Sequence, residues 1–295
     1  MFNIKDAGDF RHQIRNYATL ILFSTLTLTG VSVHAGKNSL SLQTVFDSGD
    51  SRDTFIDLSI SLNKKTQLFL GAGNTTSDES STGAGDEIDL DYLNLGISHK
   101  FNNIFTMSLN GSTSGQGREI NTRDINTKMT WATDNWIFSL RPQFRKIELL
   151  VDPPLLAPRI IDINSTGAGI SLGYIGKENW EFFFKFDTYS YDRNLKGQVV
   201  NFIINRLSSN AFTVASSLND SSMKINITRL YEKSDITVSI GQSKSATDSS
   251  LLNVANINMN FYHFDPVTLG LELGGANSET NDSSHYMGLT LSYSW

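Results

Sequence analysis

Apolar and polar residues alternate one by one in short stretches that recur along the chain. In the stretch 286–295, Met287, Leu289 and Leu291 fall on one side of an extended chain, and small polar residues fall on the other. Side chains point to alternate faces of a β-strand, so a period of two predicts strands rather than helices. Similar stretches of about ten residues follow one another from Gly36 on, which predicts an all-β chain whose strands each present one apolar face.

The connections between these stretches alternate between tight turns and longer polar loops. The expected tight turns are 63–65, 101–103, 133–135, 176–179, 207–210, 232–235 and 263–266, and the expected longer loops are 74–88, 113–122, 146–165, 191–197, 242–250 and 277–284. The pattern predicts a transmembrane antiparallel up-and-down β-barrel of about sixteen strands, within a range of about 12 to 18. Two short alternating stretches, 200–204 and 212–217, are counted among these strands. Both ends of the barrel chain then lie at the short-turn end.

The tryptophans gather at one end of the predicted barrel. Trp131, Trp136 and Trp180 lie beside short turns, and Trp295 is the last residue. Aromatic side chains with a polar edge settle at the membrane–water interface, so these residues predict an interfacial girdle at the short-turn end. Arg229 falls on the outward face near the same end, where a long cationic side chain reaches the interface.

The strict alternation in 286–295, ending on an aromatic residue, resembles the terminal strand of Gram-negative outer-membrane β-barrels. The resemblance extends over residues 36–295 at the level of a porin-like class, without a specific family. It implies a place in the Gram-negative outer membrane with both termini in the periplasm, and contacts with outer-membrane lipids and lipopolysaccharide. It also implies recognition of Tyr293 and Trp295 by the barrel-assembly machinery. Proteins of this class and size are often trimers, so the resemblance extends to a possible homotrimer.

Residues 1–35 have the pattern of an export signal. Lys5, Arg11 and Arg15 form a basic start, an apolar run follows at 18–29, and small residues precede the expected cleavage after Ala35. We expect residues 36–295 to form one barrel domain. An uncleaved anchor helix is the alternative, although the apolar run falls short of the ~20 residues that a spanning helix needs.

Composition narrows the possible partners and compartments. The chain has 295 residues, no cysteine and a net charge of −6. A negative net charge argues against a nucleic-acid partner, and the absence of cysteine fits passage through the oxidising periplasm. No later stretch approaches the ~18 consecutive apolar residues of a membrane helix, so the remaining chain is either soluble or crosses a membrane as strands.

The strand faces opposite the apolar ones are polar. A barrel of about sixteen strands is too wide for its own side chains to fill, which predicts a water-filled channel for passive diffusion of small hydrophilic solutes or ions. The charged residues expected to line it are Asp57, Lys128, Arg141, Arg145, Glu181, Lys185, Asp187, Lys224 and Glu272. Opposed charges across such an interior could form a selective porin eyelet, or they could be ion pairs along the wall that only solvate the lumen.

The expected loop 146–165 is unusually apolar and holds three of the five prolines. The phase of the flanking strands turns its apolar residues toward the barrel axis, which predicts a constriction that bends over or into the lumen. The expected constriction residues are Leu149, Val151, Pro153, Pro154, Pro158 and Ile161. A β-bulge that resets the phase and lets the loop pack on a neighbour is the alternative.

Signals for catalysis or for cofactors are weak. His99 and His263 fall at short turns, and His285 points outward on the predicted strand, so no arrangement of nucleophile and base is indicated. The acidic residues of 74–91 could gather divalent cations or simply be solvated. The sequence therefore predicts no enzyme, no cofactor, no catalytic residue and no metal site. The alternative to a channel is a non-enzymatic structural or surface-interaction barrel.

Overall fold

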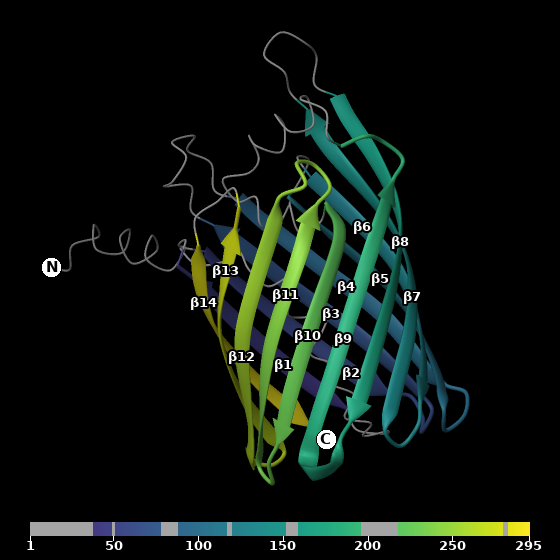
Figure 1. Cartoon of the computed structure of the whole chain (residues 1–295), viewed down its shortest axis with the longest axis vertical. Coiled ribbons are helices and arrows are strands. Elements are labelled where there is room, and N and C mark those ends of the chain that lie inside the picture. Colours follow the sequence, from purple (N-terminus) through teal and green to yellow (C-terminus); the bar gives the residue numbers. More distant parts are fainter. Residues whose placement is uncertain are drawn as a thin grey trace, which may run out of the picture.

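The computed structural model describes residues 38–48, 51–77, 88–116, 120–151, 159–195, 218–279 and 283–295. These residues form one closed antiparallel barrel of 14 strands, in which each strand pairs with its neighbours in the sequence and β1 pairs with β14 (Figure 1). No described helix is long and apolar enough to cross a membrane. The predicted signal peptide lies outside the described residues.

The strands differ in length around the barrel. They are β1 Ser39–Asp47, β2 Ser51–Ser61, β3 Thr66–Ser77, β4 Ile88–Lys100, β5 Phe105–Gln116, β6 Ile120–Ala132, β7 Trp136–Val151, β8 Arg159–Ile175, β9 Trp180–Tyr191, β10 Asn219–Leu230, β11 Ser234–Ser245, β12 Leu251–Phe264, β13 Val267–Ser278 and β14 Ser284–Ser294, with a short 3-10 helix η2 at Lys177–Asn179.

The all-β barrel prediction is confirmed, but the barrel has 14 strands and not the expected sixteen, a number inside the expected range of 12 to 18. β9 pairs directly with β10, so Phe186 lies opposite Met223 and no barrel strand separates them. The two extra strands were expected at 200–204 and 212–217, which lie outside the described residues. Alternation over five or six residues was the only reason to expect them, and a period of two does not say which strand a segment pairs with.

The barrel closes where its two ends meet. Ser39 lies opposite Ser294, and Asn38 and Trp295 exchange two backbone hydrogen bonds of 3.0 and 3.1 Å. Both ends of the described chain therefore lie at one end of the barrel, where the connections are 62–65, 101–104, 133–135, 176–179, 231–233 and 265–266. The connections at the other end include 78–87, 152–158 and 192–218. We call the two ends the short-turn end and the loop end.

Asparagine side chains shape two of the short turns. Asn63 Oδ1 accepts hydrogen bonds from the backbone N–H groups of Lys65 and Thr66, and Asn102 Oδ1 accepts from Ile104 and Phe105. A side-chain carbonyl that bonds its own backbone two or three residues on replaces a backbone turn bond. This local chemistry explains why these turns were visible in the sequence.

The outer surface carries an apolar belt bounded by aromatic rings. All four tryptophans are exposed and lie at strand ends of the short-turn end. Around β4 to β7 the rings follow one another at 4.8–5.8 Å between centroids, through His99, Phe101, Phe105, Trp131 and Phe138. Aromatic girdles of this kind mark the boundary of the hydrocarbon layer, so the belt and its girdle identify the chain as an outer-membrane β-barrel.

Several inward-facing glycines let a neighbouring ring lie flat against the inner wall. A Cβ at Gly173 would fall 2.7 Å from Cδ1 of Phe183, and the ring of Phe183 therefore covers this part of β8. Gly73 accommodates Phe55 and Gly274 accommodates Tyr286 in the same manner. Because these rings cover the wall, they project less toward the barrel axis.

We expect Gly173→Ala to lower the resistance of the folded barrel to heating in SDS, because the added methyl group displaces the Phe183 ring. Overpacking of this kind costs roughly 1–3 kcal/mol. Gly111→Ala is the matched control, since the nearest atom to its added Cβ is 3.9 Å away. The measurement is the temperature at which the band of the unboiled protein changes to the unfolded mobility. Equal temperatures for the two variants would contradict this packing role.

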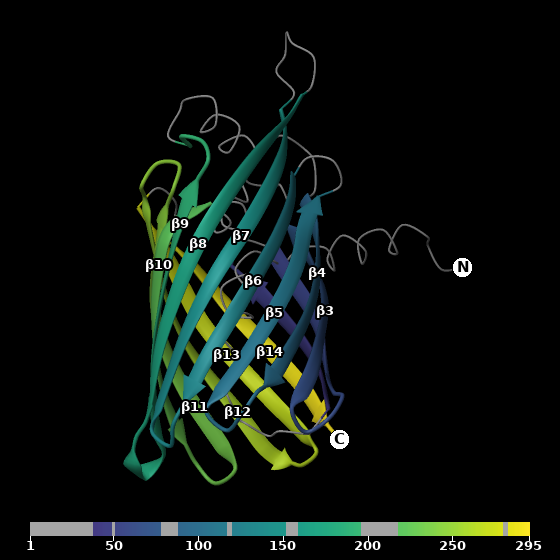
Figure 2. The ribbon, with the colours of Figure 1, turned by 90° about the vertical axis from the view of Figure 1, so that its right-hand side faces the viewer.

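Strands β7 and β8 continue far beyond the predicted loop boundary. Residues 146–151 and 159–165 are paired strand, with Leu149 opposite Ile161 and Leu150 opposite Ile160, so the expected loop 146–165 is wrong for these residues. Figures 1 and 2 show this hairpin rising above the rest of the rim. The extension was hard to recognise in the sequence because the outward positions above the apolar belt are polar. The alternation of apolar outward and polar inward residues is therefore lost there.

Candidate functional site

The predicted lining residues lie on the inner wall of the barrel. Four cations form a band across neighbouring strands: Lys128 on β6, Arg141 on β7, Lys185 on β9 and Lys224 on β10. Lys185 lies directly opposite Lys224 in the β9–β10 ladder. Like charges directly opposite each other on one face destabilise a sheet, so this cationic band is not explained by fold stability.

Lys128 and Arg141 form the second like-charged pair of the cationic band. The β6–β7 ladder has Asn126 opposite Gln143 and Met129 opposite Leu140, and this register places Lys128 opposite Arg141. The ladder is interrupted between these two pairs, next to Pro142, which has no N–H to donate. No hydrogen bond or carboxylate partner of Lys128 is found among the described residues.

Asp187 is the acidic residue inside the cationic band. Its side chain is almost fully buried and accepts hydrogen bonds from Arg141 and from Gln143, the latter at 2.9 Å, while Lys185 Nζ lies 3.3 Å away. The Arg141–Asp187 pair crosses Gly169 of β8, where a Cβ would collide with both side chains. The pair therefore lies flat on the wall, and the carboxylate neutralises only part of the band.

A second ion pair lies nearer the loop end. Arg145 of β7 donates hydrogen bonds to Asp124 of β6, with Nη2 3.3 Å from Oδ2, and its guanidinium carbon lies 5.4 Å from the ring centroid of Tyr189. Arg145 therefore belongs to a wall-bound pair, and the cationic band consists of the other four cations. The Arg141–Asp187 and Arg145–Asp124 pairs both match the wall-bound ion pairs that were one of the two interpretations of the sequence.

The acidic residues Asp57 and Glu272 lie on strands distant from β6 and β7. Asp57 of β2 is inward-facing yet exposed, and its carboxylate lies over Gly71 of β3. Glu272 of β13 is buried and accepts hydrogen bonds from Asn256 Nδ2 and from the Tyr286 hydroxyl at 3.1 Å. Lys224 of the cationic band and Glu272 interact electrostatically, so the band is coupled to an acidic residue on β13.

The remaining predicted lining residue, Glu181, lies at the short-turn end of β9, two residues from Phe183. Two buried inward aromatic side chains were not among the predicted lining residues. Phe55 and Tyr286 are buried together with Val45, and Tyr92 meets the Phe55 ring edge-on at 5.9 Å between centroids. The alternation offered a signal for this, because Phe55 is two residues from Asp57 on β2 and therefore lies on the same inward face.

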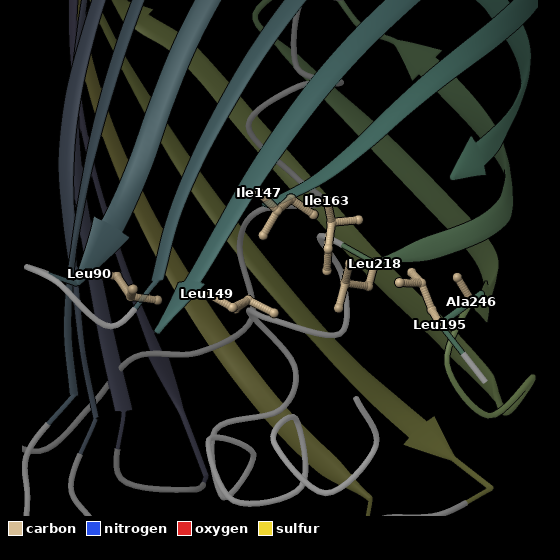
Figure 3. Close-up of a cluster of buried hydrophobic side chains, with 7 residues drawn as sticks. All are labelled: Leu90, Ile147, Leu149, Ile163, Leu195, Leu218 and Ala246. Carbon is tan, nitrogen blue, oxygen red and sulfur yellow. The ribbon is translucent and has the colours of Figure 1, made fainter. Parts of the chain in front are cut away.

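An apolar cluster lies inside the barrel at its loop end. Ile147, Leu149 and Ile163 are 0–1% exposed and belong to the inward face of the β7–β8 hairpin. We call the full set the mouth cluster: Leu90, Ile147, Leu149, Ile163, Leu195, Leu218 and Ala246, with Ile161 and Tyr191 packed against it. Figure 3 shows its seven buried side chains in a row from Leu90 to Ala246, inside the ring of strands.

The predicted constriction residues have different positions in relation to this cluster. Leu149 is a buried member, and Ile161 lies opposite Leu149 and packs against the cluster. Val151 is the last residue of β7. Pro153, Pro154 and Pro158 lie outside the described residues. The inward phase of Ile147, Leu149 and Ile163 continues from β7 and β8 without a bulge in their mutual register.

The outward face of the same hairpin is charged. Lys146 Nζ lies 2.8 Å from Glu148 and 3.4 Å from Asp162, and Arg123 lies 3.8 Å from Glu148. These residues lie above the apolar belt, and the hydrogen bond from Lys146 lowers the pKa of the Glu148 carboxyl. A charged outer face places this part of the hairpin outside the hydrocarbon layer.

No group of three or more metal-ligating side chains occurs in the described part of the chain. The acidic residues Asp78, Glu79, Asp86 and Glu87 of the expected cation-gathering segment lie outside it. His285 is exposed on β14, and its backbone N–H donates to Ser48 Oγ at 3.0 Å. His99 and His263 lie in the aromatic girdle, where each ring packs against a phenylalanine.

Comparison with known proteins assigns no family to the chain. No family model matches the chain, and no curated protein matches it in sequence. It is similar to the NanC porin, with a TM-score of 0.47 and 10% identity over 86% of this chain and 98% of that one. It is also similar to OmpT of Vibrio cholerae lacking loop L8, with a TM-score of 0.48 and 8% identity over 88% and 98% of the two chains.

A third similar structure is the outer membrane protein OpdK of Pseudomonas aeruginosa, with a TM-score of 0.43 and 10% identity over 88% and 98% of the two chains. These similarities are distant, and no family is assigned to the chain. The resemblance seen in the sequence is confirmed for the class of outer-membrane β-barrels, which the closed sheet and the apolar belt of this chain show directly.

Proposed function

We propose that this protein is a non-enzymatic outer-membrane channel for small hydrophilic solutes, with a preference for anions set by the cationic band. The observation that carries the proposal is that like charges face each other in the strand register at two places on one inner wall, Lys128 opposite Arg141 and Lys185 opposite Lys224. Such pairs raise the local positive potential, and fields of this kind concentrate ions of the opposite sign.

The arrangement of the wall supports passage of solutes. Glycines let Phe183, Tyr286 and the Arg141–Asp187 pair lie flat, which leaves space toward the axis. The exposed carboxylate of Asp57 marks a part of the inner face that water reaches. A 14-stranded barrel is also wider than the eight-stranded barrels that side chains fill.

The direct test is conductance in planar lipid bilayers together with the reversal potential in a salt gradient. Lys128→Gln should shift the reversal potential toward cations and lower the anion-to-cation permeability ratio by roughly a factor of two to five, because it removes a charge without a carboxylate partner. Lys146→Gln is the matched control, since Lys146 lies on the outward face of the hairpin. An unchanged ratio in Lys128→Gln, with stable channels, contradicts the assigned role of the band.

We propose that the short-turn end, with both chain termini, faces the periplasm, and that lipopolysaccharide surrounds the loop end. The charged outer face of the β7–β8 hairpin supports this orientation. The proposal also includes assembly as a homotrimer and recognition of β14 by the barrel-assembly machinery. A protease site placed in the loop 133–135 should be protected in intact cells and cut after the outer membrane is opened.

The mouth cluster favours a second candidate function, a closed barrel that serves adhesion or envelope structure. Its residues pack against one another inside the loop end and leave little of their surface exposed. Stable single-channel steps from the wild-type protein support the channel, and their absence in a correctly folded preparation supports the closed barrel.

A further inference from the structure

A charged residue lies on the lipid-facing side of β10. Arg229 continues the outward row of Met223, Ile225 and Ile227, which are all exposed on the apolar belt. Its position, one residue before the end of the strand, puts the guanidinium at the level of the aromatic girdle. A cation on the outer face of a membrane barrel is costly unless a group of the interface receives it.

Two aromatic rings hold the guanidinium of Arg229. Its central carbon lies 5.0 Å from the ring centroid of Trp180 and 5.9 Å from that of Tyr231. Guanidinium groups stack on aromatic faces through cation–π attraction, and the stacking leaves the N–H groups in the plane available.

The turn between β8 and β9 supplies a third contact. Arg229 Nη1 donates a hydrogen bond to the backbone carbonyl of Glu178. Glu178 and Asn179 have φ angles of 61° and 64°, a left-handed conformation that non-glycine residues seldom adopt. This turn therefore holds an uncommon backbone shape at the residue whose carbonyl receives the guanidinium.

Most donors of this guanidinium have no acceptor among the residues that the structure describes. A guanidinium has five N–H donors, and the contact to Glu178 uses one nitrogen. Among the described residues, no carboxylate pairs with Arg229. At the depth of the girdle, the anions that surround a membrane protein are the phosphate groups of lipids.

We propose that Arg229, Trp180 and Tyr231 form a binding site for the phosphate group of a glycerophospholipid in the leaflet at the short-turn end. The phosphate accepts two parallel N–H donors from Arg229, and the acyl chains lie along the outward row of β10. The rings fix the guanidinium in the orientation that a bidentate contact requires. This site is independent of solute passage through the barrel.

The test is native mass spectrometry of the full-length protein released from detergent after incubation with phosphatidylglycerol, with diacylglycerol, or with inorganic phosphate. We expect bound phosphatidylglycerol on the wild-type protein and at least about five-fold lower occupancy on Arg229→Gln, because the bidentate acceptor contact is lost. Arg229→Lys should also bind weakly, since an ammonium group lacks the planar fork.

Lys65→Gln is the matched control, because Lys65 is an exposed cation in a turn of the same end. Each variant is first checked for resistance to SDS, so that only folded barrels are compared. Equal phosphatidylglycerol occupancy on folded Arg229→Gln and wild type overturns the site. Equal binding of diacylglycerol shows that the acyl chains alone are recognised, and binding of inorganic phosphate without a lipid preference overturns the lipid assignment.

Discussion

Replacing both Leu149 and Ile163 with alanine should enlarge the single-channel conductance of the protein. Both side chains are 1% exposed and belong to the mouth cluster inside the loop end of the barrel. Removal of a buried leucine or isoleucine side chain to alanine costs about 2–5 kcal/mol, most of it from the cavity that remains. Loosening this packing widens the passage, because both side chains point toward the axis.

The control for this experiment lies on the same hairpin. Ile160 is 66% exposed on the outward face, so Ile160→Ala removes a similar side chain without touching the mouth cluster. The comparison uses single-channel conductance at fixed voltage and salt, for barrels that still resist SDS before heating. If the double variant folds and conducts like the wild type, the mouth cluster does not limit the passage.

Deleting Trp295 should block assembly of the barrel and leave the chain in the periplasm. The deletion removes an exposed ring stacked on Tyr293 at 5.8 Å and also the two backbone hydrogen bonds to Asn38 that close the sheet. Each such bond contributes about 0.5–1.5 kcal/mol, which is small for a whole barrel, so a complete block would indicate recognition of the ring.

Two substitutions separate recognition from closure. Trp295→Ala keeps the backbone bonds and removes the ring, and we expect it to be nearly as harmful as the deletion, whereas Trp295→Phe should assemble. Trp136→Ala is the control, because Trp136 is an equally exposed ring at the same end of the barrel. The readout is the amount of heat-modifiable protein in the outer-membrane fraction. Normal amounts of Trp295→Ala would remove the terminal ring as an assembly signal.

The sequence predicted those parts of the fold in which one face of a strand contacts lipid and the other faces the barrel interior, because the two faces then differ strongly in polarity. Met287, Leu289 and Leu291 face the lipid side, so the apolar face and the phase of β14 followed from alternation, and the place of the tryptophans followed from their position beside short turns. Alternation also predicted the inward phase of Ile147 and Leu149, although it gave no reason to expect paired strand there.

The strand number and the contacts of the site could not be predicted, because both depend on register. Nothing in the alternation of 200–204 distinguishes a barrel strand from another extended segment. Lys185 and Lys224 were both expected in the lumen, but only the pairing of β9 with β10 puts them opposite each other. Nothing in the sequence marked Gly169 as important for the inner wall. Because Gly169 has no side chain, Arg141 can reach Asp187 across β8.

The strands have unequal lengths, so they end at different heights at the loop end of the barrel. β7 and β8 have 16 and 17 residues, whereas β1 has 9, and each residue adds about 3.3 Å along a strand. The described strands therefore reach farthest on the side of β7 and β8 (Figures 1 and 2). In the proposed channel, a solute entering from the loop end passes the apolar inner face of the hairpin before the cationic band, so the proposal assigns capture and selection to different parts of the molecule.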